Sequence, residues 1–353
     1  MSNNLFHFAN GELTQDGVIC WLLNWFNCDN PRLKEMAESL IHKMIGNVQV
    51  ESVAVFQQFM KIDVLVIVNK TIGIIIEDKV YSSVHDNQIQ RYRNELEDHN
   101  HITLEGTDYT LDPQKLKTVY WKTGFYYDYD KVVTADCKID SKTLLELLEP
   151  YGDGSEILAD YIVRLQEIRD WYSVHEDVTS LEHLRKEYYT QYTLMRQFFP
   201  EEKWEKAADK KRELYQIYHG SSYGRPYTQM RILFKEEPDN EDSYALFWRI
   251  DSDNGGPYLS LRLYQEDISG EKGERHKARL QEYKEKMKAL IETDTAPCPL
   301  QWEQVQPRNR ENAREAVVFH LHLEDYLAQW DTCQKPLTKT VRNINDRFLE
   351  KLK

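Results

Sequence analysis

The chain has 353 residues, of which 41% are hydrophobic and 12% aromatic, which is enough for one large or two ordinary domains with packed cores. No stretch approaches eighteen apolar residues, and Met1 to Asn10 lack a basic stretch followed by an apolar run, so neither a membrane span nor a secretory signal is expected. The net charge of −14 argues against a protein that coats nucleic acid without sequence preference.

The cysteines and the distribution of charge limit the class of protein further. Residues 1–175 hold 27 acidic and 16 basic side chains, so −11 of the net charge lies in the first half. A local basic groove, or a metal ion that offsets clustered carboxylates, is compatible with this balance. The five cysteines are odd in number, scattered and without a C-x-x-C pair, which predicts a reducing, cytoplasmic environment. They are Cys20, Cys28, Cys137, Cys298 and Cys333.

The first half of the chain alternates helical and strand patterns. Thr14 is the predicted N-cap of a helix through Phe26, and Pro31 opens a second helix that Gly46 ends. The later predicted elements are strands Val48–Phe59, Lys61–Val68 and Thr71–Val80, helix Asp86–His99, strand Lys117–Thr123, and helices Ser141–Leu148 and Ser155–Tyr172. This order predicts an α/β (α+β) domain over residues 1–175, with a mixed sheet flanked by helices.

The second half is predicted to be a separate domain, residues 176–353, with a helical connector and an antiparallel α+β unit. Its predicted elements are helices 179–198 and 201–218, a break at Gly220–Pro226, strands Tyr227–Phe234, Ser243–Ile250 and Pro257–Tyr264 with a turn at Asp253–Gly256 before the last, helix Gly270–Ile291, strand Ala316–Leu323 and a terminal helix.

Charged residues follow the most apolar strand directly. Ile74-Ile75-Ile76 lead into Glu77-Asp78-Lys79, and Glu77 and Lys79 project from one face because they are two residues apart. A three-residue hairpin loop at Asn69–Thr71 places Asp63 opposite Glu77 on that face, whereas a two-residue loop places Asp63 opposite Ile76. With the longer loop, two carboxylates and one ammonium converge.

Such a set suits phosphodiester hydrolysis. Carboxylates are hard oxygen ligands for Mg²⁺, and a lysine beside them can stabilise charge or orient a water. The alternative for an isolated Glu-x-Lys is a salt bridge at a strand end. Two further residues favour the site: Gln88 and Tyr92 are four apart on one face of the next predicted helix, where they can orient ligands or a scissile phosphate.

Asp63, Glu77-x-Lys79 and Gln88-x-x-x-Tyr92, on a β-β-β-α-β backbone after an N-terminal helix, resemble the PD-(D/E)XK nuclease superfamily. The Gln-x-x-x-Tyr helix is similar to that of its RecB-like and λ-exonuclease-like branches. The resemblance covers residues 10–125, with Ile62 in place of the proline that gives the family its name.

The resemblance implies a restriction-endonuclease-like fold and a cytoplasmic Mg²⁺-dependent nuclease, with Mn²⁺ able to substitute. It implies that Asp63, Glu77 and the Asp78 carbonyl hold metal and that Lys79 assists the attacking water, while Gln88 and Tyr92 position the site. DNA is the expected substrate, RNA is left open, and restriction or defence is a role by analogy.

The family also often has a metal-shell glutamate on its first helix. Glu12 is the first match in this sequence, Asp16 the second, and Glu51 on the first strand a further alternative. Favourable charges at a helix N-terminus explain Glu12 and Asp16 equally well. For the chain as a whole, the alternative function is a non-catalytic interaction protein on a nuclease-like scaffold.

Three other features have weaker functional interpretations. His320 and His322 share a strand face and could bind a transition metal, but no third ligand is apparent, which favours ordinary strand histidines. Gly152–Ser155 has phosphate-loop glycine spacing without the lysine, so a turn with a helix cap is expected. The predicted loop that contains Tyr223, Arg225 and Tyr227 combines stacking and phosphate-pairing groups, although a packed loop is the simpler interpretation.

Overall fold

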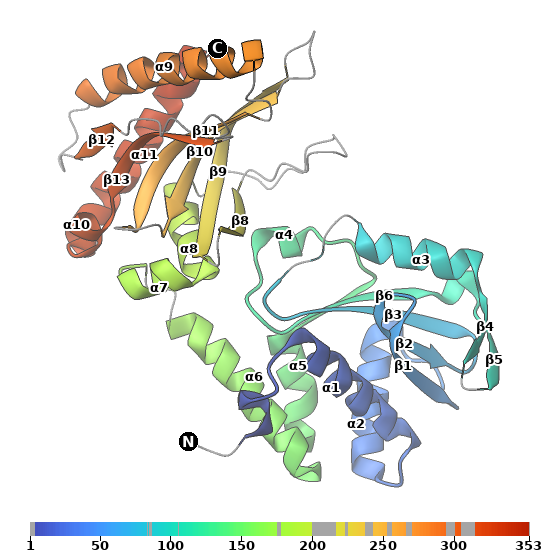
Figure 1. The fold of residues 1–353 in the computed structure, drawn as a ribbon. Helices are drawn as coiled ribbons and strands as arrows, with labels where there is room; N and C mark the ends of the chain where they lie inside the picture. Colours follow the sequence, from blue (N-terminus) through green and yellow to red (C-terminus); the bar gives the residue numbers. More distant parts are fainter. Residues whose placement is uncertain are drawn as a thin grey trace. The chain divides into compact units, whose positions relative to one another are not determined.

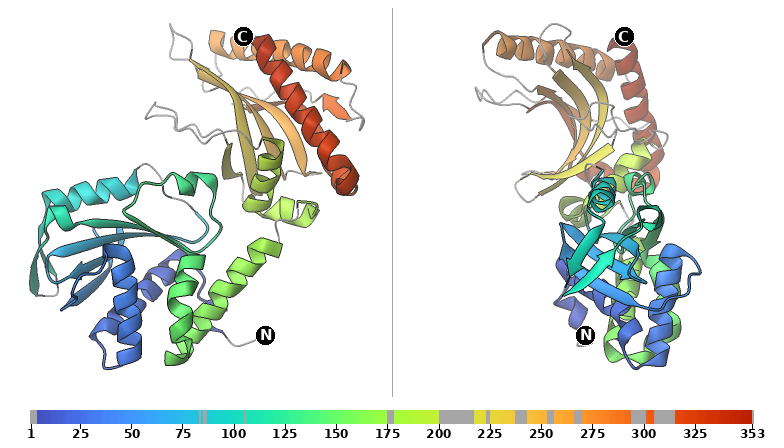
Figure 2. Two further views of the ribbon diagram at one scale, coloured as in Figure 1. Left: turned by 180° about the vertical axis from the view of Figure 1, so that it is seen from behind. Right: turned by 90° about the vertical axis from the view of Figure 1, so that its right-hand side faces the viewer.

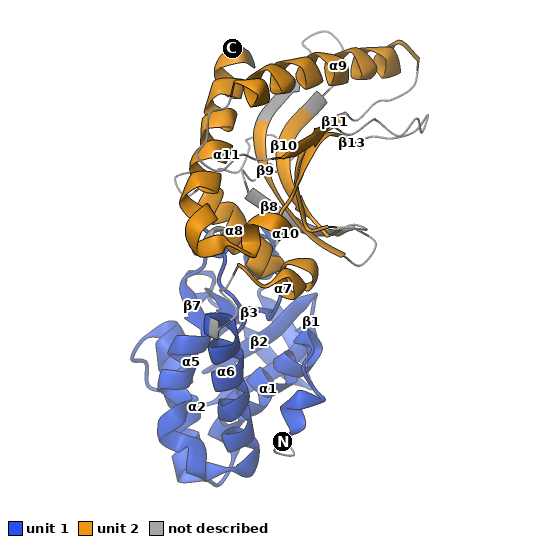
Figure 3. Ribbon diagram, turned by 90° about the vertical axis from the view of Figure 1, so that its left-hand side faces the viewer, with its two compact units in different colours: residues 1–174 blue, residues 175–353 orange. Residues whose placement is uncertain are grey.

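The computed structural model describes residues 4–82, 84, 87–104, 106–174, 178–199, 217–222, 225–236, 243–252, 256–265, 270–293, 301–304 and 315–352. The chain divides into two compact units, Met1–Val174 and His175–Lys353 (Figure 3). Each unit has its own sheet and helices (Figures 1 and 2). In the described part of the chain, no helix combines the length and apolarity that crossing a bilayer needs.

The first unit follows the predicted order of elements closely. In chain order they are α1 (Glu12–Asn24), α2 (Pro31–Ile45), β1 (Val53–Phe59), β2 (Ile62–Val68), β3 (Ile72–Lys79), α3 (Gln88–Asp98), β4 (His101–Leu104), β5 (Thr107–Thr110), β6 (Lys117–Lys122), α4 (Asp128–Lys131), β7 (Cys137–Asp140), α5 (Ser141–Leu148) and α6 (Glu156–Val174), with short 3-10 turns at Leu5–His7, Trp25–Asn27, Pro113–Lys115 and Glu149–Gly154. The short hairpin β4–β5 and the edge strand β7 were not predicted, because each of these strands has four residues, too few to show a period.

The main sheet of this unit is mixed, as predicted. Its order is β1-β2-β3-β6-β7, with antiparallel pairing among β1, β2 and β3 and parallel pairing among β3, β6 and β7. Val68 pairs with Ile72, so the β2–β3 connection is the three-residue loop and not the two-residue alternative. Asn69 and Lys70 in that loop have φ of 53° and 61°, the left-handed region that such tight connections require.

Helices cover both faces of the sheet (Figure 1). Ile74 and Ile76 of β3 belong to the core cluster that packs against α1, α2, α5 and α6, whereas Ile75 belongs to the cluster beneath α3. β3 is therefore buried on both sides, as its continuous apolar run predicted. Gly73 leaves room for a neighbour, since a Cβ there would lie 2.6 Å from Leu116 Cδ2.

The start of α1 differs from the prediction. Gly11, not Thr14, is the N-cap, and its carbonyl accepts hydrogen bonds from the N–H groups of Thr14 and Gln15. The earlier start adds almost one turn, so Glu12 now lies inside the helix one turn before Asp16. The two carboxylates therefore project from the same side of α1.

The second unit has an antiparallel sheet of six strands in the order β12-β13-β11-β10-β9-β8. Its elements are α7 (Leu181–Lys186), α8 (Tyr188–Phe198), β8 (Ile217–Ser222), β9 (Arg225–Glu236), β10 (Ser243–Asp251), β11 (Tyr258–Gln265), α9 (Gly270–Glu292), β12 (Trp302–Gln304), β13 (Glu315–His322), α10 (Glu324–Leu327) and α11 (Trp330–Leu352). The helices α8, α9 and α11 lie on one side of this sheet (Figure 3).

Several predictions for this unit need correction. The helix expected over 179–198 is interrupted at Glu187, whose extended backbone separates α7 from α8. The helix expected over 201–218 falls mainly outside the described residues, and its last two positions begin β8 instead because they pair with β9. The predicted strand from Tyr227 begins earlier, at Arg225, so Arg225 lies in β9 and not in a loop, while Tyr223 lies outside the described residues. The turn predicted at 253–256 also falls largely outside them.

Candidate active site

Asp63, Glu77 and Lys79 converge at the ends of β2 and β3. The β2–β3 register, continued one residue beyond Val64–Ile76, sets Asp63 opposite Glu77 on the face that α3 covers. Lys79 lies two residues further along the same face. The hairpin therefore has the three-residue loop that places Asp63 on the same face as Glu77. The side chain of Lys79 contacts both carboxylates.

The ammonium of Lys79 lies among three oxygens. Its Nζ is 2.5 Å from Glu77 Oε1, 2.7 Å from the Asp78 carbonyl oxygen and 3.5 Å from Asp63 Oδ2. Asp63 Oδ2 also accepts the Asp78 N–H at 3.0 Å, which fixes the aspartate against β3. Glu77 is completely buried, and the side chain of Lys79 is 12% exposed, so these charges interact with little screening by solvent.

The oxygen donors fit a hard divalent cation. Glu77 Oε2 is buried and accepts no hydrogen bond from any residue that the structure describes. Leaving a carboxylate oxygen buried and unpaired is costly, so this atom is available to a ligand. Together with Asp63 and the Asp78 carbonyl, it forms the all-oxygen set that Mg²⁺ prefers.

Asp78 contributes to the site through its backbone only. Its side chain points to the opposite face, where Oδ1 accepts a hydrogen bond from Gln15 Nε2 of α1 at 2.9 Å. Gln15 also exchanges hydrogen bonds with Thr123, at 2.8 and 3.0 Å. Burial raises the pKa of Asp78 well above its usual value, although the hydrogen bond from Gln15 opposes that effect. The buried Asp78–Gln15 pair ties α1 to β3 behind the site.

α1 brings two further carboxylates toward Asp63. Gln58 Nε2 donates to Asp16 Oδ2 at 2.7 Å and lies 3.5 Å from Asp63 Oδ1, so one amide links the two aspartates. Gln58 adopts a φ of 55°, which is unusual for a residue other than glycine in a strand. Glu12 instead accepts the Val80 N–H at 3.3 Å and the Ser82 hydroxyl at 2.7 Å, just beyond β3. Of the two α1 carboxylates, Asp16, which was the second match from the sequence, therefore has the closer link to Asp63.

Glu51 is at the wrong end of the sheet. Its N–H donates to Asn69 Oδ1 at 2.8 Å in the β2–β3 loop, whereas Asp63 lies at the opposite end of β2. As a contributor to this site, the Glu51 alternative was wrong. The sequence predicted a strand from Val48 that includes Glu51. The strand actually begins at Val53, so Glu51 precedes it.

Gln88 and Tyr92 lie on α3, which covers the face that carries Glu77 and Lys79. Gln88 Nε2 donates to the Tyr92 hydroxyl at 2.9 Å, and the Tyr92 ring is buried in the apolar cluster beneath α3. Among the contacts of the described residues, neither side chain reaches the carboxylates or Lys79. The structure brings this pair to the correct face, and its positioning role stays a prediction.

A second buried ion pair, which was not predicted from the sequence, adjoins the site. Lys122 follows Trp121 on β6 and lies beside Lys79 in the parallel register. Its Nζ donates to Asp130 Oδ2 and to the Ser82 carbonyl, each at 2.8 Å, and the side chains of Lys122 and Asp130 are both fully buried. A signal was available, because Lys122 follows an apolar run directly, as Glu77 follows Ile74-Ile75-Ile76.

The environment changes the acidity of these groups. Burial raises the pKa of Glu77 to about 7 against the opposing charge of Lys79, and Asp63 adds to the increase. Burial and the charge of Asp63 likewise raise the pKa of Asp16 to about 6. Burial favours the neutral amine of Lys79, but Glu77, Asp63 and Glu12 outweigh it and raise the pKa of this lysine, which stays an ammonium at neutral pH.

These shifts predict how the metal-free protein responds to pH. Between the ordinary carboxyl pKa and the raised folded values, the folded state binds more protons than the unfolded state, so stability falls as pH rises toward about 8. We expect Glu77→Gln to become progressively more stable relative to the wild type over this interval, because glutamine has no charge to bury. Thermal unfolding in a chelator between about pH 5 and 8 measures the difference. If the unfolding temperatures of the two proteins change with pH in the same way, the prediction is contradicted.

The fold and these contacts together define the structural class of the first unit. A five-stranded mixed sheet flanked by helices, with an aspartate, a glutamate and a lysine meeting at the ends of neighbouring strands, is a restriction-endonuclease-like architecture. Residues 16–115 match the family model of the PD-(D/E)XK nuclease superfamily, which confirms the resemblance seen in the sequence. The matched segment contains Asp63, Glu77, Lys79, Gln88 and Tyr92. Curated proteins and solved structures give no significant match.

Proposed function

We propose that this chain is a metal-dependent nuclease that hydrolyses phosphodiester bonds, with DNA as the expected substrate. The observation that supports this most strongly is the convergence of Asp63, Glu77 and Lys79 at one end of the sheet, within the segment that matches the nuclease family. RNA is the alternative substrate. The Gln-x-x-x-Tyr helix further favours the RecB-like and λ-exonuclease-like branches.

In this proposal, Asp63, the unpaired oxygen of Glu77 and the Asp78 carbonyl hold Mg²⁺, for which Mn²⁺ can substitute. Asp16 and Glu12 add negative charge from α1, and Gln58 keeps Asp16 close to Asp63. When bound, the metal supplies Lewis acidity toward the phosphate and lowers the pKa of a coordinated water. The raised pKa of Glu77 means that protons compete with metal below neutral pH.

Lys79 is the proposed catalytic cation. An ammonium has three N–H donors and no lone pair, so it orients the attacking water and stabilises charge that develops on the phosphate. Its present contacts with Glu77 and the Asp78 carbonyl hold it at the metal-binding oxygens. Gln88 and Tyr92 position the substrate or the ligands from α3.

The competing proposal is a non-catalytic interaction protein on this scaffold. It is favoured by the ion pair between Lys79 and Glu77 Oε1, because this pair balances the charge of the glutamate without metal, although Oε2 stays unpaired among the described residues. The two proposals differ in whether the carboxylates accept a cation and whether nucleic acid is cleaved. In either case, we propose that the second unit selects the substrate or the partner.

We further propose that the protein works in the cytoplasm. The four cysteines in the described part of the chain are all free thiols. A secreted protein of this size would more often use such residues in disulfides. A role in restriction or defence rests on analogy with the superfamily.

The decisive experiment combines metal binding with cleavage. We expect millimolar Mg²⁺ or Mn²⁺ to raise the thermal stability of the wild type, because a ligand that binds only the folded state stabilises it. Asp63→Asn should lose both this shift and the cleavage of a panel of DNA and RNA substrates. Asp112→Asn is the matched control, since Asp112 pairs with Lys115 at 3.3 Å elsewhere in the same unit. A wild type that neither binds metal nor cleaves any substrate would establish the scaffold alternative.

A further inference from the structure

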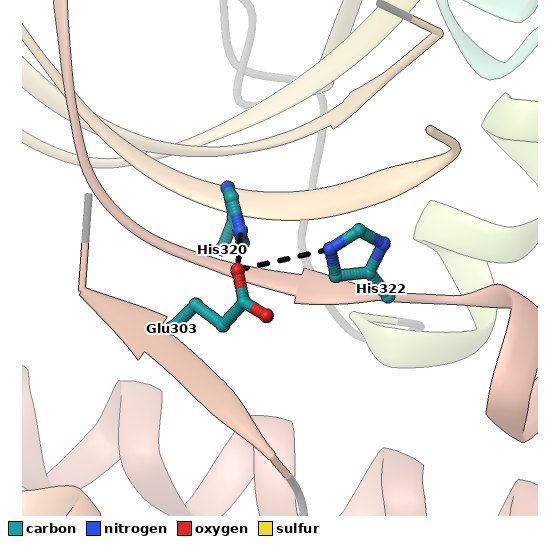
Figure 4. Close-up of side chains that lie close together, drawn as sticks. All are labelled: Glu303, His320 and His322. Atoms are coloured by element: carbon teal, nitrogen blue, oxygen red, sulfur yellow. Dashed lines mark hydrogen bonds and ion pairs between the residues drawn. The ribbon is translucent and has the colours of Figure 1, made fainter. Parts of the chain in front are cut away.

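Two histidines and a glutamate meet in the second unit, outside the proposed active site. His320 and His322 come from β13, and Glu303 comes from the neighbouring edge strand β12, directly opposite His320 in the register. Figure 4 shows the Glu303 carboxylate directed toward both imidazole rings. The third ligand that the sequence did not reveal is therefore present, seventeen residues before His320.

The distances are close to those of a metal centre. Glu303 Oε2 is 2.6 Å from His320 Nε2 and 3.8 Å from His322 Nε2, and one donor atom from each residue lies within 4.8 Å of the other two. Ligands at tetrahedral positions around Zn²⁺, with bonds near 2.1 Å, would be about 3.4 Å apart. The donor atoms, which lie within 4.8 Å of one another, exceed that spacing by at most about 1.4 Å, a difference that side-chain rotations can close.

The neighbouring strand holds the imidazoles in place. The ring of Tyr258 on β11 stacks on His320 with centroids 4.8 Å apart and meets the edge of His322 at 4.5 Å. The two imidazoles are themselves 5.2 Å apart and nearly perpendicular. Such packing restricts both rings before any ligand arrives, which reduces the ordering entropy that binding would cost.

The cluster lies on the side of the sheet away from α11. Trp302, one residue before Glu303, packs against Trp248, and Trp248 donates to Asn345 of α11 at 3.0 Å. Strand alternation then directs Glu303 to the other side. Glu303 is 60% exposed and His322 is 39% exposed, so an ion can reach the donor atoms from solvent.

Two arginines that the structure describes on this side of the sheet do not oppose a cation. Arg249 and Arg262 lie on the same side of the sheet, but Asp251 and Glu315 pair with both of them at 2.5 to 3.3 Å, so this group is neutral as a whole. The hydrogen bond from His320 lowers the pKa of Glu303, which is therefore a carboxylate at neutral pH. The cluster thus offers one negative charge and two imidazoles.

We propose that Glu303, His320 and His322 form a binding site for a divalent transition-metal ion such as Zn²⁺, with one coordination position open. Two imidazole nitrogens and one carboxylate oxygen are ligands that Zn²⁺ and Co²⁺ accept and that Mg²⁺ disfavours. The ion joins the three-residue strand β12 to β13, and so fixes the edge of the sheet. This site is separate from the Mg²⁺ site proposed at Asp63 and Glu77.

The test is a titration of the full-length protein with Co²⁺ and then Zn²⁺, with millimolar Mg²⁺ present to occupy the oxygen site. We expect one equivalent of Co²⁺ to give visible d–d absorption of a tetrahedral centre without thiolate charge-transfer bands, and Zn²⁺ to displace it. Glu303→Gln and His322→Ala should each weaken Zn²⁺ binding by about a hundredfold or more, since they remove a ligand. Zn²⁺ should also raise the unfolding temperature of the wild type but not of Glu303→Gln.

His7→Ala is the matched control. His7 forms a similar ion pair with Glu167 at 2.8 Å in the first unit, and its loss should leave Zn²⁺ affinity unchanged. Asp63→Asn should likewise retain the Co²⁺ spectrum, which separates this site from the nuclease site. Equal affinity in the wild type and Glu303→Gln, thiolate bands, or no binding at submillimolar Zn²⁺ would each overturn the proposal.

Discussion

Replacing Lys79 by alanine is expected to reduce nucleic acid cleavage by about a hundredfold or more, the usual scale for removal of one preorganised electrostatic group. Metal-induced stabilisation should stay roughly intact, because an ammonium has no lone pair to donate to a cation. The measurements are the single-turnover cleavage rate and the shift in unfolding temperature on adding Mg²⁺. Together they distinguish a catalytic cation from a metal ligand, since Asp63→Ala should abolish both.

Two further variants sharpen this test. Lys79→Arg should not restore full activity, because a planar guanidinium differs in shape and hydration from the compact ammonium that fits among Glu77, Asp63 and the Asp78 carbonyl. Lys115→Ala removes an exposed lysine of the same unit and should cleave at the wild-type rate. Wild-type cleavage by Lys79→Ala would refute the mechanism while leaving the fold unaffected.

The largest loss of stability is expected from Lys122→Met. This substitution leaves Asp130 fully buried without its cationic partner, and breaking a buried pair by removing one member costs about 3–5 kcal/mol. The Tyr120 hydroxyl and the Tyr127 N–H still donate to Asp130, at 2.7 and 2.8 Å, but neither supplies a charge. Chemical denaturation followed by circular dichroism measures the free energy of unfolding.

The double variant Lys122→Met/Asp130→Asn separates charge from packing. Asparagine has nearly the same shape as aspartate, so removing the unpaired charge should recover much of the lost stability. Lys115→Met, at an exposed ion pair, should change stability little. If the double variant is as unstable as Lys122→Met alone, the loss comes from packing of the lysine stem and not from the buried carboxylate.

The geometry of the candidate site was predictable to the extent that it depends on one hairpin. The residues Asp63, Glu77 and Lys79 could be placed together because strand alternation and a three-residue loop fix their register. Pattern alone left the loop length open, and a two-residue loop would have turned Asp63 away. The choice among the α1 carboxylates was less secure, since Thr14 as N-cap leaves Glu12 outside the helix, whereas the observed N-cap Gly11 places it on one side of α1 with Asp16.

Other features depend on contacts that local pattern does not encode. Asp130 meets Lys122 only because the chain after β6 folds back over the strand end. Glu303 meets His320 through a three-residue strand that is too short to show alternation. In each case, a residue with an ordinary local sequence acquires its partner from tertiary folding.

Position 58 illustrates how a single side chain can restrict sequence variation. A left-handed backbone in a glutamine costs free energy that glycine would avoid, and asparagine also tolerates this conformation better. Glycine, however, has no amide to span Asp16 and Asp63, and asparagine is one methylene shorter. Substitutions that relax the backbone therefore uncouple helix from strand. We expect homologues to keep the strained glutamine, or to replace it together with one of the two aspartates.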